Sequence, residues 1–592
     1  MVERHTAELE VSVGGAPLPR AWGLALAWTF VEESGHASAS AEVGFRDPGC
    51  ELIARTGIGL GARVKLVALD ERGKHDLFEG EITGCETRAA ESGVFSVVRA
   101  EDYAHRLKRG RRVVGYHQMS AHQIAEKLAR DAGLKAGEID RTPLVYDFIT
   151  QPVVSDWDFL THLARENGCD VFVRSGALHF KNLAKASDAP AGRARARQSP
   201  FALEYGQNLV KVQSGASLRE QVTSVQVRGW DPELKKELVA DRRIGSTPSR
   251  DVRWKAASDA VGGAPLLLSS VPRASQREVE LVADAMAQEV AGSLTELHAV
   301  VRGEPRLRLR SAVTLSGLGD QFSGRYTVTS VRHEYHPDTG YMTEAAVREG
   351  ADRSVVGRPG DAEEGVRRIP GLVSAQVVDI KDPEEQGRVK LCFPWLSDEY
   401  VSNWARTVQL GGSKGGGIVI PEVGDEVLVG FEQGSLERPY VIGGLYNGVN
   451  KPKPRKPDLY DKTKGVANRR SFESKMGHRL ELLDADMGPL GVLLATGDDK
   501  LWIDLDQHGT RIVIHSDGAV QIEAKGNVKV KGNGITLDAG SGALELNGSE
   551  IKLTGKQSVD VSGAQVKVNG TAAVKVNGGA LTEIKGALVT LN

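Results

Sequence analysis

The sequence predicts a mainly β protein whose C-terminal part needs further copies of the chain to complete its core. Three observations support this prediction. The chain holds 68 glycines among 592 residues but only 5% Phe, Trp and Tyr, which favours strands joined by tight turns. Short runs that alternate apolar and polar residues recur along most of the chain. Residues 503–592 lack proline, cysteine and aromatic residues and repeat short alternating strands broken by glycine.

These patterns divide the chain into segments of different type. A chain of 592 residues is too long for one core and suggests about four domains. In chain order we expect a first β-barrel at 1–115, an insertion of helices and a hairpin at 116–200, a second β-barrel with one helix at 201–350, a linker at 351–370, an OB fold at 371–449, a linker at 450–471 and a rod of intertwined chains at 472–592.

The first barrel is predicted from alternating runs such as Ala7–Val13. Two helices are expected in the insertion that follows. Ser120 with Gln123 has the spacing of a capping box, and Ser155 precedes an apolar run in the same way. Ser175 and Gly176 separate two short alternating strands, which predicts a hairpin.

The second barrel region contains one expected helix, which Ser275 and Glu278 would cap. A short motif links the two barrel regions. An alternating strand leads to Phe-x-Gly-x-Ile-Thr from Phe78 in the first and to Phe-x-Gly-x-Tyr-Thr from Phe322 in the second. We interpret this echo as duplication of one barrel; chance similarity is the alternative.

The segment 371–449 combines five short alternating runs with turn sequences. Examples of the turns are Asp382-Pro383 and Val423-Gly-Asp425. Five strands in so short a stretch suit a small Greek-key barrel of OB type. The sequence Lys451–Pro457 then alternates basic residues with proline, which predicts an extended linker.

The C-terminal strands follow one another at steps of seven or eight residues and have one apolar face each. A narrow ribbon of such strands would leave that face in water. We therefore predict that identical chains wind together into a stiff, prism-like rod. The residues expected in the shared core of this needle are Val528, Val530, Ile535, Leu537, Leu544, Leu546, Ile551, Leu553, Val559, Val561, Val566, Val568, Val574 and Val576.

Several motifs resemble those of one known family. The OB domain of VgrG-type spike proteins is closely resembled by the block that contains Asp382-Pro383, Gln386–Val389, Phe393–Trp395, Trp404–Arg406, Pro421–Val427 and Leu445–Asn447. The hub half of the same family, phage late control D, is resembled by Ser155–Leu160 and Val227–Asp231. The N-terminal half is more similar to spikes of extracellular or phage-tail-like contractile injection systems than to those of type VI secretion.

The resemblance implies a non-enzymatic homotrimer with a tail hub, an OB collar and a triple-stranded β-helical needle. The implied partners are the hexameric inner tube that the spike caps, baseplate proteins, a PAAR-type tip protein and effector cargo. On sheath contraction the spike would puncture the target envelope, with transient contact with the target membrane. The particle would be phage-tail-like, and either released or acting extracellularly.

The last residues differ from the regular repeat. In Ile584–Asn592 the apolar residues stand on both faces of the strand. We therefore expect a blunt, partly apolar end that binds the tip protein through Leu588, Val589 and Leu591. Simple fraying of the terminus is the alternative.

Composition and motifs give no support for catalysis, a cofactor or a metal. The net charge of −3 gives no reason to expect nucleic acid as a partner. The four cysteines lack metal-type spacing, so we expect free buried thiols, with one disulfide or a reactive thiol as the alternative. Asp504 and Asp506 have the spacing of solvated strand residues rather than of a paired acid site. His515 is expected on the surface, and Gly411–Gly417 lacks the order of a phosphate loop.

Two further features concern partners and location. The basic run from Arg106 to Arg112 is expected to be a solvated face or a contact for an acidic partner protein. No apolar stretch is long enough for a transmembrane helix, and the N-terminus lacks a signal-peptide pattern, so we expect assembly in the cytoplasm.

Two other functions remain open. One is a polysaccharide-binding or polysaccharide-degrading β-helical tail protein, although a needle without aromatic residues disfavours it. The other is a type VI secretion VgrG that anchors effectors.

Overall fold

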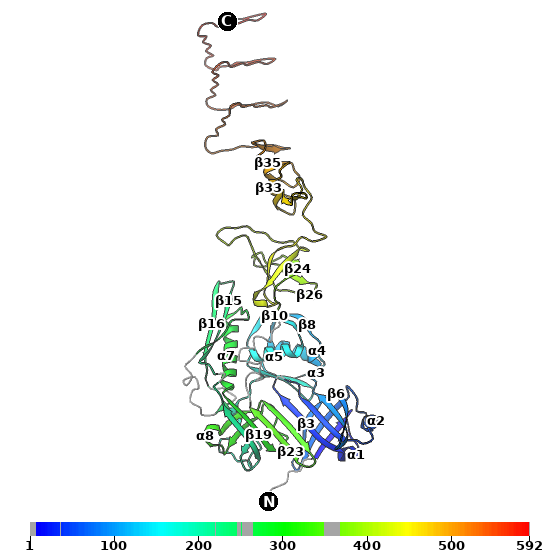
Figure 1. The fold of residues 1–592 in the computed structure, drawn as a ribbon. Coiled ribbons are helices and arrows are strands. Elements are labelled where there is room, and N and C mark those ends of the chain that lie inside the picture. The colour runs from blue at the N-terminus through cyan, green and yellow to red at the C-terminus, as the bar shows by residue number, and fades with distance from the viewer. Residues whose placement is uncertain are drawn as a thin grey trace. The chain divides into compact units, whose positions relative to one another are not determined.

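The computed structural model describes residues 8–35, 37–218, 221–245, 250–251, 264–347 and 368–590. The chain forms two compact units, Met1–Pro452 and Lys453–Asn592 (Figure 1). Strands outnumber helices in both, so the predicted mainly β class is confirmed. Among the described residues, no helix has the length and apolar character needed to cross a membrane. The four cysteines are free, as predicted, but only Cys169 is buried; Cys50 is exposed, and Cys85 and Cys392 are partly exposed.

The largest sheet of the first unit has eleven strands (Figure 1). Its order is β14-β19-β23-β22-β3-β4-β7-β6-β5-β1-β2. These strands are β1 (Glu8–Val13), β2 (Ala16–Pro17), β3 (Leu26–Ser34), β4 (Ser40–Arg46), β5 (Arg63–Asp70), β6 (Gly73–Ala90), β7 (Gly93–Glu101), β14 (Leu209–Ala216), β19 (Thr295–Arg302), β22 (Ser330–His336) and β23 (Gly340–Val347). Two short helices, α1 (Arg20–Leu24) and α2 (Leu52–Thr56), lie in the connections.

The two regions expected as separate barrels share this sheet. Strand β3 of the first pairs antiparallel with β22 of the second, with Val31 opposite His333. Glu33 of β3 is 6% exposed and accepts hydrogen bonds from the Arg308 side chain and from the backbone N–H of Leu309. Burial alone would raise the pKa of Glu33, but the charge and hydrogen bonds of Arg308 outweigh burial and lower this pKa to about 2. The sheet and this buried ion pair therefore join chain segments some 300 residues apart.

The insertion has the helices and hairpin that the sequence predicts. It comprises α3 (His105–Lys108), β8 (Arg112–Ser120), α4 (Ala121–Asp131), β9 (Lys135–Ile139), β10 (Val145–Val154), α5 (Asp156–Glu166), β11 (Cys169–Arg174) and β12 (Ala177–Asn182). The capping box of Ser120 and Gln123 is confirmed. The Ser155 hydroxyl accepts a hydrogen bond from the backbone N–H of Asp158 at 3.1 Å, as expected for an N-cap. Strands β11 and β12 form the predicted hairpin.

The rest of the second region packs one long helix on a small sheet. Its elements are η1 (Ala186–Asp188), β13 (Ala202–Glu204), β15 (Ser224–Asp231), β16 (Lys236–Arg243), β17 (Arg250–Asp251), β18 (Leu266–Leu268), α7 (Gln276–Gly292), β20 (Ala312–Ser316), α8 (Gly319–Phe322) and β21 (Gly324–Thr327). The predicted cap is confirmed, since the Ser275 hydroxyl accepts from the backbone N–H of Glu278 at 3.2 Å. Val279 and Val282 of α7 form a buried cluster with Val225 of β15.

The echoed motifs form similar hairpins. Each motif strand pairs antiparallel with the alternating strand before it, with Gly80 opposite Val64 in the first and Gly324 opposite Leu315 in the second. A Cβ at Gly80 would lie 2.1 Å from the carbonyl oxygen of Glu101, so close strand packing excludes a side chain there.

The third part of the first unit is a six-stranded sheet in the order β26-β25-β24-β28-β29-β27. The elements are β24 (Leu372–Asp379), β25 (Lys390–Phe393), β26 (Ser397–Val401), β27 (Arg406–Thr407), β28 (Glu426–Phe431), η3 (Glu432–Gly434) and β29 (Pro439–Gly444). The sheet closes around a buried cluster that includes Leu391, Phe393 and Val427. Val113 and Phe148 of the insertion pack against the same cluster, so the insertion and this barrel are in direct contact.

The second unit begins with an antiparallel meander. A short pair, β30 (Tyr460–Asp461) and β31 (Val466–Ala467), precedes five strands: β32 (Arg469–Glu473), β33 (Arg479–Asp484), β34 (Leu490–Ala495), β35 (Leu501–Asp506) and β36 (Arg511–Ser516). Regular pairing therefore starts inside the stretch 450–471 that was expected as a linker. From residue 517 to residue 590 the single chain is extended and is assigned no strand.

Candidate assembly surface

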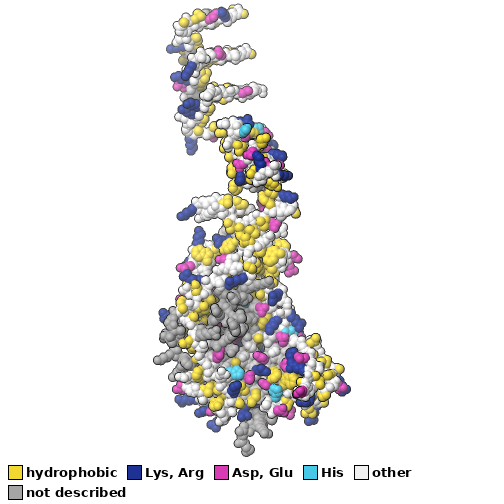
Figure 2. Space-filling view, viewed as in Figure 1, with side chains coloured by type: hydrophobic (Ala, Val, Ile, Leu, Met, Phe, Trp, Pro, Cys, Tyr) yellow, Lys and Arg dark blue, Asp and Glu magenta, His cyan; other side chains and the backbone are white. Residues whose placement is uncertain are grey.

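The predicted needle residues are exposed in the single chain. All fourteen, from Val528 to Val576, have between 52% and 74% of their surface exposed. Figure 2 shows hydrophobic side chains interspersed with basic and acidic ones along this C-terminal segment. So many exposed valine, isoleucine and leucine side chains are unusual for a soluble protein on its own. The single chain therefore leaves the predicted core positions available for contact with other chains.

The five-stranded meander has an exposed apolar face that the sequence analysis did not single out. Strand register places its members side by side: Leu480 is opposite Leu494, which is opposite Ile503, which is opposite Ile514. We call this set the apolar meander face, and it consists of Phe472, Leu480, Leu482, Leu494, Ile503, Leu505, Ile512 and Ile514, between 39% and 70% exposed. The alternation in Leu501–Leu505 and Ile512–Ile514 is the sequence signal that could have identified it.

The opposite face of the meander is the one that is partly covered, and it combines buried charged residues with the apolar Leu483 and Ala495, each 6% exposed. Arg469, Arg479 and Glu481 are 5%, 9% and 1% exposed. The Arg479 Nε lies 3.3 Å from Glu481 Oε2, and the Arg469 Nη1 lies 3.5 Å from Glu481 Oε1. In an ordinary sheet the apolar face packs on the core and the polar face is solvated, whereas here both sides carry apolar side chains and the buried charges lie on the covered side. The single chain therefore leaves the apolar meander face uncovered.

Apolar residues are also exposed on the six-stranded barrel. The loop between β27 and β28 carries Val408, Leu410, Ile418 and Val419, between 58% and 84% exposed. The glycine stretch Gly411–Gly417 is a tight turn in this loop, closed by a bridge between Gly412 and Gly415. It therefore matches the expected loop and not a phosphate-binding turn that opens a helix.

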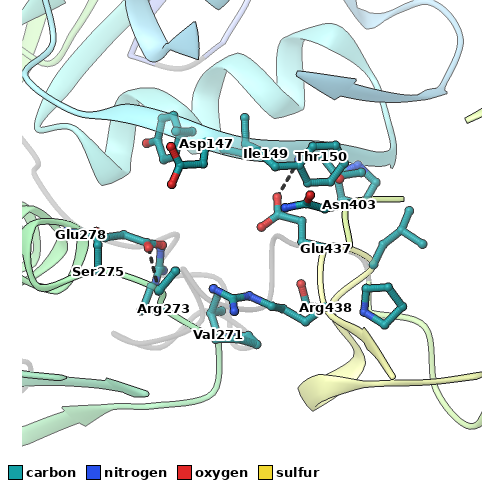
Figure 3. A pocket seen from close by; sticks show the side chains of 18 of the residues that line it. Asp147, Ile149, Thr150, Val271, Arg273, Ser275, Glu278, Asn403, Glu437 and Arg438 are labelled. Atoms are coloured by element: carbon teal, nitrogen blue, oxygen red, sulfur yellow. Dashed lines mark hydrogen bonds and ion pairs between the residues drawn. The ribbon is translucent and has the colours of Figure 1, made fainter. Parts of the chain in front are cut away.

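The insertion, the barrel and the segment that leads into α7 line a partly open cavity of about 460 Å³ (Figure 3). On one side the Glu437 carboxylate of the barrel accepts a hydrogen bond from the backbone N–H of Thr150 at 2.6 Å. Burial raises the pKa of Glu437 to about 7. On the other side Arg273 Nη1 lies 2.6 Å from Glu166 Oε1 and 3.2 Å from Glu278 Oε1. These contacts connect the barrel, the insertion and the start of α7 around one polar space.

The remaining residues considered in the sequence form ordinary contacts. Asp506 accepts hydrogen bonds from Arg511 Nε and from the backbone N–H of Gly509, both at 2.9 Å, so it stabilises a turn. Asp504 lies on the partly covered side of the meander, opposite Val513. The His515 ring stacks on the Trp502 ring, with 4.9 Å between the ring centroids. Within the described ranges, no three His, Cys, Asp or Glu side chains are grouped as metal ligands would be.

The basic run is largely used inside the chain. The Arg106 guanidinium pairs with Glu81, and Arg112 Nε lies 2.7 Å from Asp156 Oδ1. Lys108 lies over the ring of Trp157. The run therefore orders the start of the insertion, and only part of it remains a solvated surface, at Arg109 and Arg111.

Two family models match the chain. Residues 61–336 match the Alg8 N-terminal domain, and residues 373–446 match the type VI secretion system/phage-baseplate injector OB domain. The predicted OB fold is thereby confirmed.

Curated relatives match shorter stretches. The spike protein VgrG3 of type VI secretion from Vibrio cholerae is 33% identical over 142 residues, 23% of this chain and 14% of VgrG3. VgrG5 from Pseudomonas aeruginosa is 38% identical over 94 residues, 15% of this chain and 12% of VgrG5. The chain thus matches only a small part of the length of these relatives.

Among solved structures, a half-lidded Francisella PdpA-VgrG complex has a similar fold. The TM-score is 0.50 at 10% identity, over 87% of this chain and 88% of the other. At this identity the likeness concerns the fold alone. Together with the OB match and the VgrG relatives, it confirms the resemblance that the sequence motifs indicated.

Proposed function

We propose that this chain, a VgrG-type spike protein, acts as a homotrimeric hub and spike of a contractile injection system. The observation that carries the proposal is the apolar meander face, together with the exposed needle residues that follow it. A face this apolar is stable in water only when it is covered. Three copies around one axis would cover it and would close a three-sided core with few free strand edges.

The needle would be the part that bears axial load. Short strands that continue from the meander at steps of seven or eight residues suit an intertwined β-helix, in which each chain moves around the axis. In this proposal the spike caps a hexameric inner tube, contacts baseplate proteins and punctures the target envelope when the sheath contracts. Effector cargo and transient contact with the target membrane belong to the same proposal.

The tip is proposed to bind at the C-terminal end. Leu588 is 85% exposed and Val589 is 48% exposed, whereas Leu591 lies outside the described residues. Deleting residues 586–592 should abolish binding of a PAAR-type tip protein while the trimer survives. Unchanged affinity for the tip would contradict this assignment.

We propose further that the chain is not an enzyme. The matched VgrG3 and VgrG5 are described as spike proteins. One relative, the VgrG1 of Vibrio cholerae, is an actin cross-linking toxin, but the match covers 17% of its length. Incubation of the purified protein with peptidoglycan and polysaccharides should give no turnover, and turnover that depends on Asp504 or Asp506 would overturn the proposal.

The type of system stays a prediction. An extracellular or phage-tail-like particle assembled in the cytoplasm is our preferred assignment, and a type VI secretion VgrG with an effector-anchoring role is the alternative. Neighbouring genes for sheath, tube and ATPase would distinguish them.

The central test is the mass of the full-length protein in solution. Size-exclusion chromatography with light scattering should give three chains per particle at micromolar concentration. A mass of one chain, with the fold intact by circular dichroism, would remove the basis of the proposed spike.

A further inference from the structure

The needle sequence has a repeat of fifteen residues that contains two strands. Leu544, Val559 and Val574 begin equivalent strands fifteen residues apart, and Ile551 and Val566 begin the intervening strands with the same spacing. Because every strand carries a similar apolar pair, the apolar core does not distinguish one strand from the next. Three chains that associate only through this core could slip past one another by one strand.

The residues between the apolar pairs carry a second pattern. In a strand, the middle residue of such a pair points to the other face. In the last of the seven strands the middle residue is Lys575, which ends the pattern; in the four strands before it the middle residues are Glu545, Lys552, Asp560 and Lys567, all exposed in the single chain. Their charges alternate in sign along the chain.

We propose that this charge alternation fixes the register of the three chains in the needle. The inference rests on the proposed trimer. In a three-sided prism, each chain moves to the next side at every strand, so threefold symmetry stacks consecutive strands of different chains on each side. Glu545 of one chain then lies next to Lys552 of a second chain, and that Lys552 lies next to Asp560 of the third.

The spacing between strands makes these contacts strong enough to select a register. Hydrogen-bonded strands lie about 4.8 Å apart, which brings neighbouring outward side chains within contact. Opposite charges there are favourable and like charges are unfavourable. If one chain slips by a single strand, Glu545 and Asp560 become neighbours, as do Lys552 and Lys567. The same apolar core is kept, but the ladder of attractions becomes a ladder of repulsions.

Two variants of the full-length protein test this inference. The first, Glu545→Lys with Asp560→Lys, makes the ladder uniformly positive. The second adds Lys552→Glu and Lys567→Glu, which restores alternation with the signs exchanged. A matched control, Asp517→Lys with Glu523→Lys, makes the same change of net charge at exposed positions that precede the needle strands.

The readout is the temperature at which the trimer dissociates, measured by light scattering at low salt and at about 1 M salt, where charges are screened over about 3 Å. We expect the uniformly positive variant to dissociate at a temperature several degrees lower at low salt, with most of the difference lost at high salt. The exchanged variant should return to the wild-type value, and the control should match the wild type.

The outcomes separate this inference from the proposed function. A trimeric wild type with an exchanged variant as unstable as the uniformly positive one would overturn the register role and leave the trimer intact. The same conclusion would follow if the uniformly positive variant behaved like the control. A monomeric wild type would overturn both proposals.

Discussion

Replacing Ile514 by aspartate should dissociate the proposed trimer without unfolding the chain. Ile514 lies on the edge strand β36 of the apolar meander face and is 60% exposed in the single chain. Full burial of an isoleucine side chain is worth about 1.5–3 kcal/mol, so covering the exposed part would contribute about 0.9–1.8 kcal/mol per chain on the same scale. Three chains would lose about 3–5 kcal/mol together, which lowers the association constant by about two to four orders of magnitude. The aspartate charge adds a desolvation cost, so this range is a lower limit.

The assay is light scattering across a dilution series, with circular dichroism to confirm the fold. The matched control is Asp504→Asn, which removes a charge from the opposite side of the same sheet and should leave the trimer unchanged. If Ile514→Asp remained trimeric at every concentration at which the wild type is trimeric, the apolar meander face would not be the association surface.

Three further predictions concern stability within the first unit. Burial raises the pKa of Glu437 from an ordinary 4.5 to about 7, so between these pH values the native state holds a proton that the unfolded state has released. The free energy of unfolding should therefore fall as pH rises from about 4.5 to 7. Glu437→Gln should remove this pH dependence in thermal melts. A melting temperature of Glu437→Gln that followed pH as the wild type does would contradict this. Burial raises the pKa of Asp382, but the hydrogen bonds from Arg388 outweigh burial and lower this pKa from an ordinary 3.8 to about 2. The stabilisation that the ionised Asp382 contributes is lost as pH falls from 3.8 to about 2. Arg388→Met should therefore move the midpoint of acid unfolding to higher pH, and an unchanged midpoint would contradict this. Ser155→Ala should lower the free energy of unfolding by about 1 kcal/mol in urea titrations because α5 loses its N-cap, whereas Ser155→Asp should retain most of it.

Local features of the fold were predictable from the sequence. Ser120, Ser155 and Ser275 precede helices by rules that depend on a few neighbouring residues, and all three begin helices in the structure. The hairpin around Ser175 depends on its turn in the same way. The OB block was recognisable because its motifs lie close together in the chain and match a known family.

Long-range pairing was not predictable in this way. The two expected barrels share one sheet because β3 pairs with β22, and no local pattern states which distant strand will occupy an edge. The register that brings Leu480, Leu494, Ile503 and Ile514 into one line depends on the turns between the strands, and the alternating pattern of each strand does not specify them. The buried pair of Glu33 and Arg308 depends on the same long-range contact.

The sequence by itself determined that the C-terminal strands have one apolar side, since alternation with a period of two assigns residues to faces. It did not determine which side of the meander the chain covers. The tertiary structure decided that: the covered side holds the paired Arg469, Arg479 and Glu481 together with Leu483 and Ala495, and the other side is exposed. Burial depends on what else packs against a sheet, and that information is carried by contacts between segments and not by any one segment.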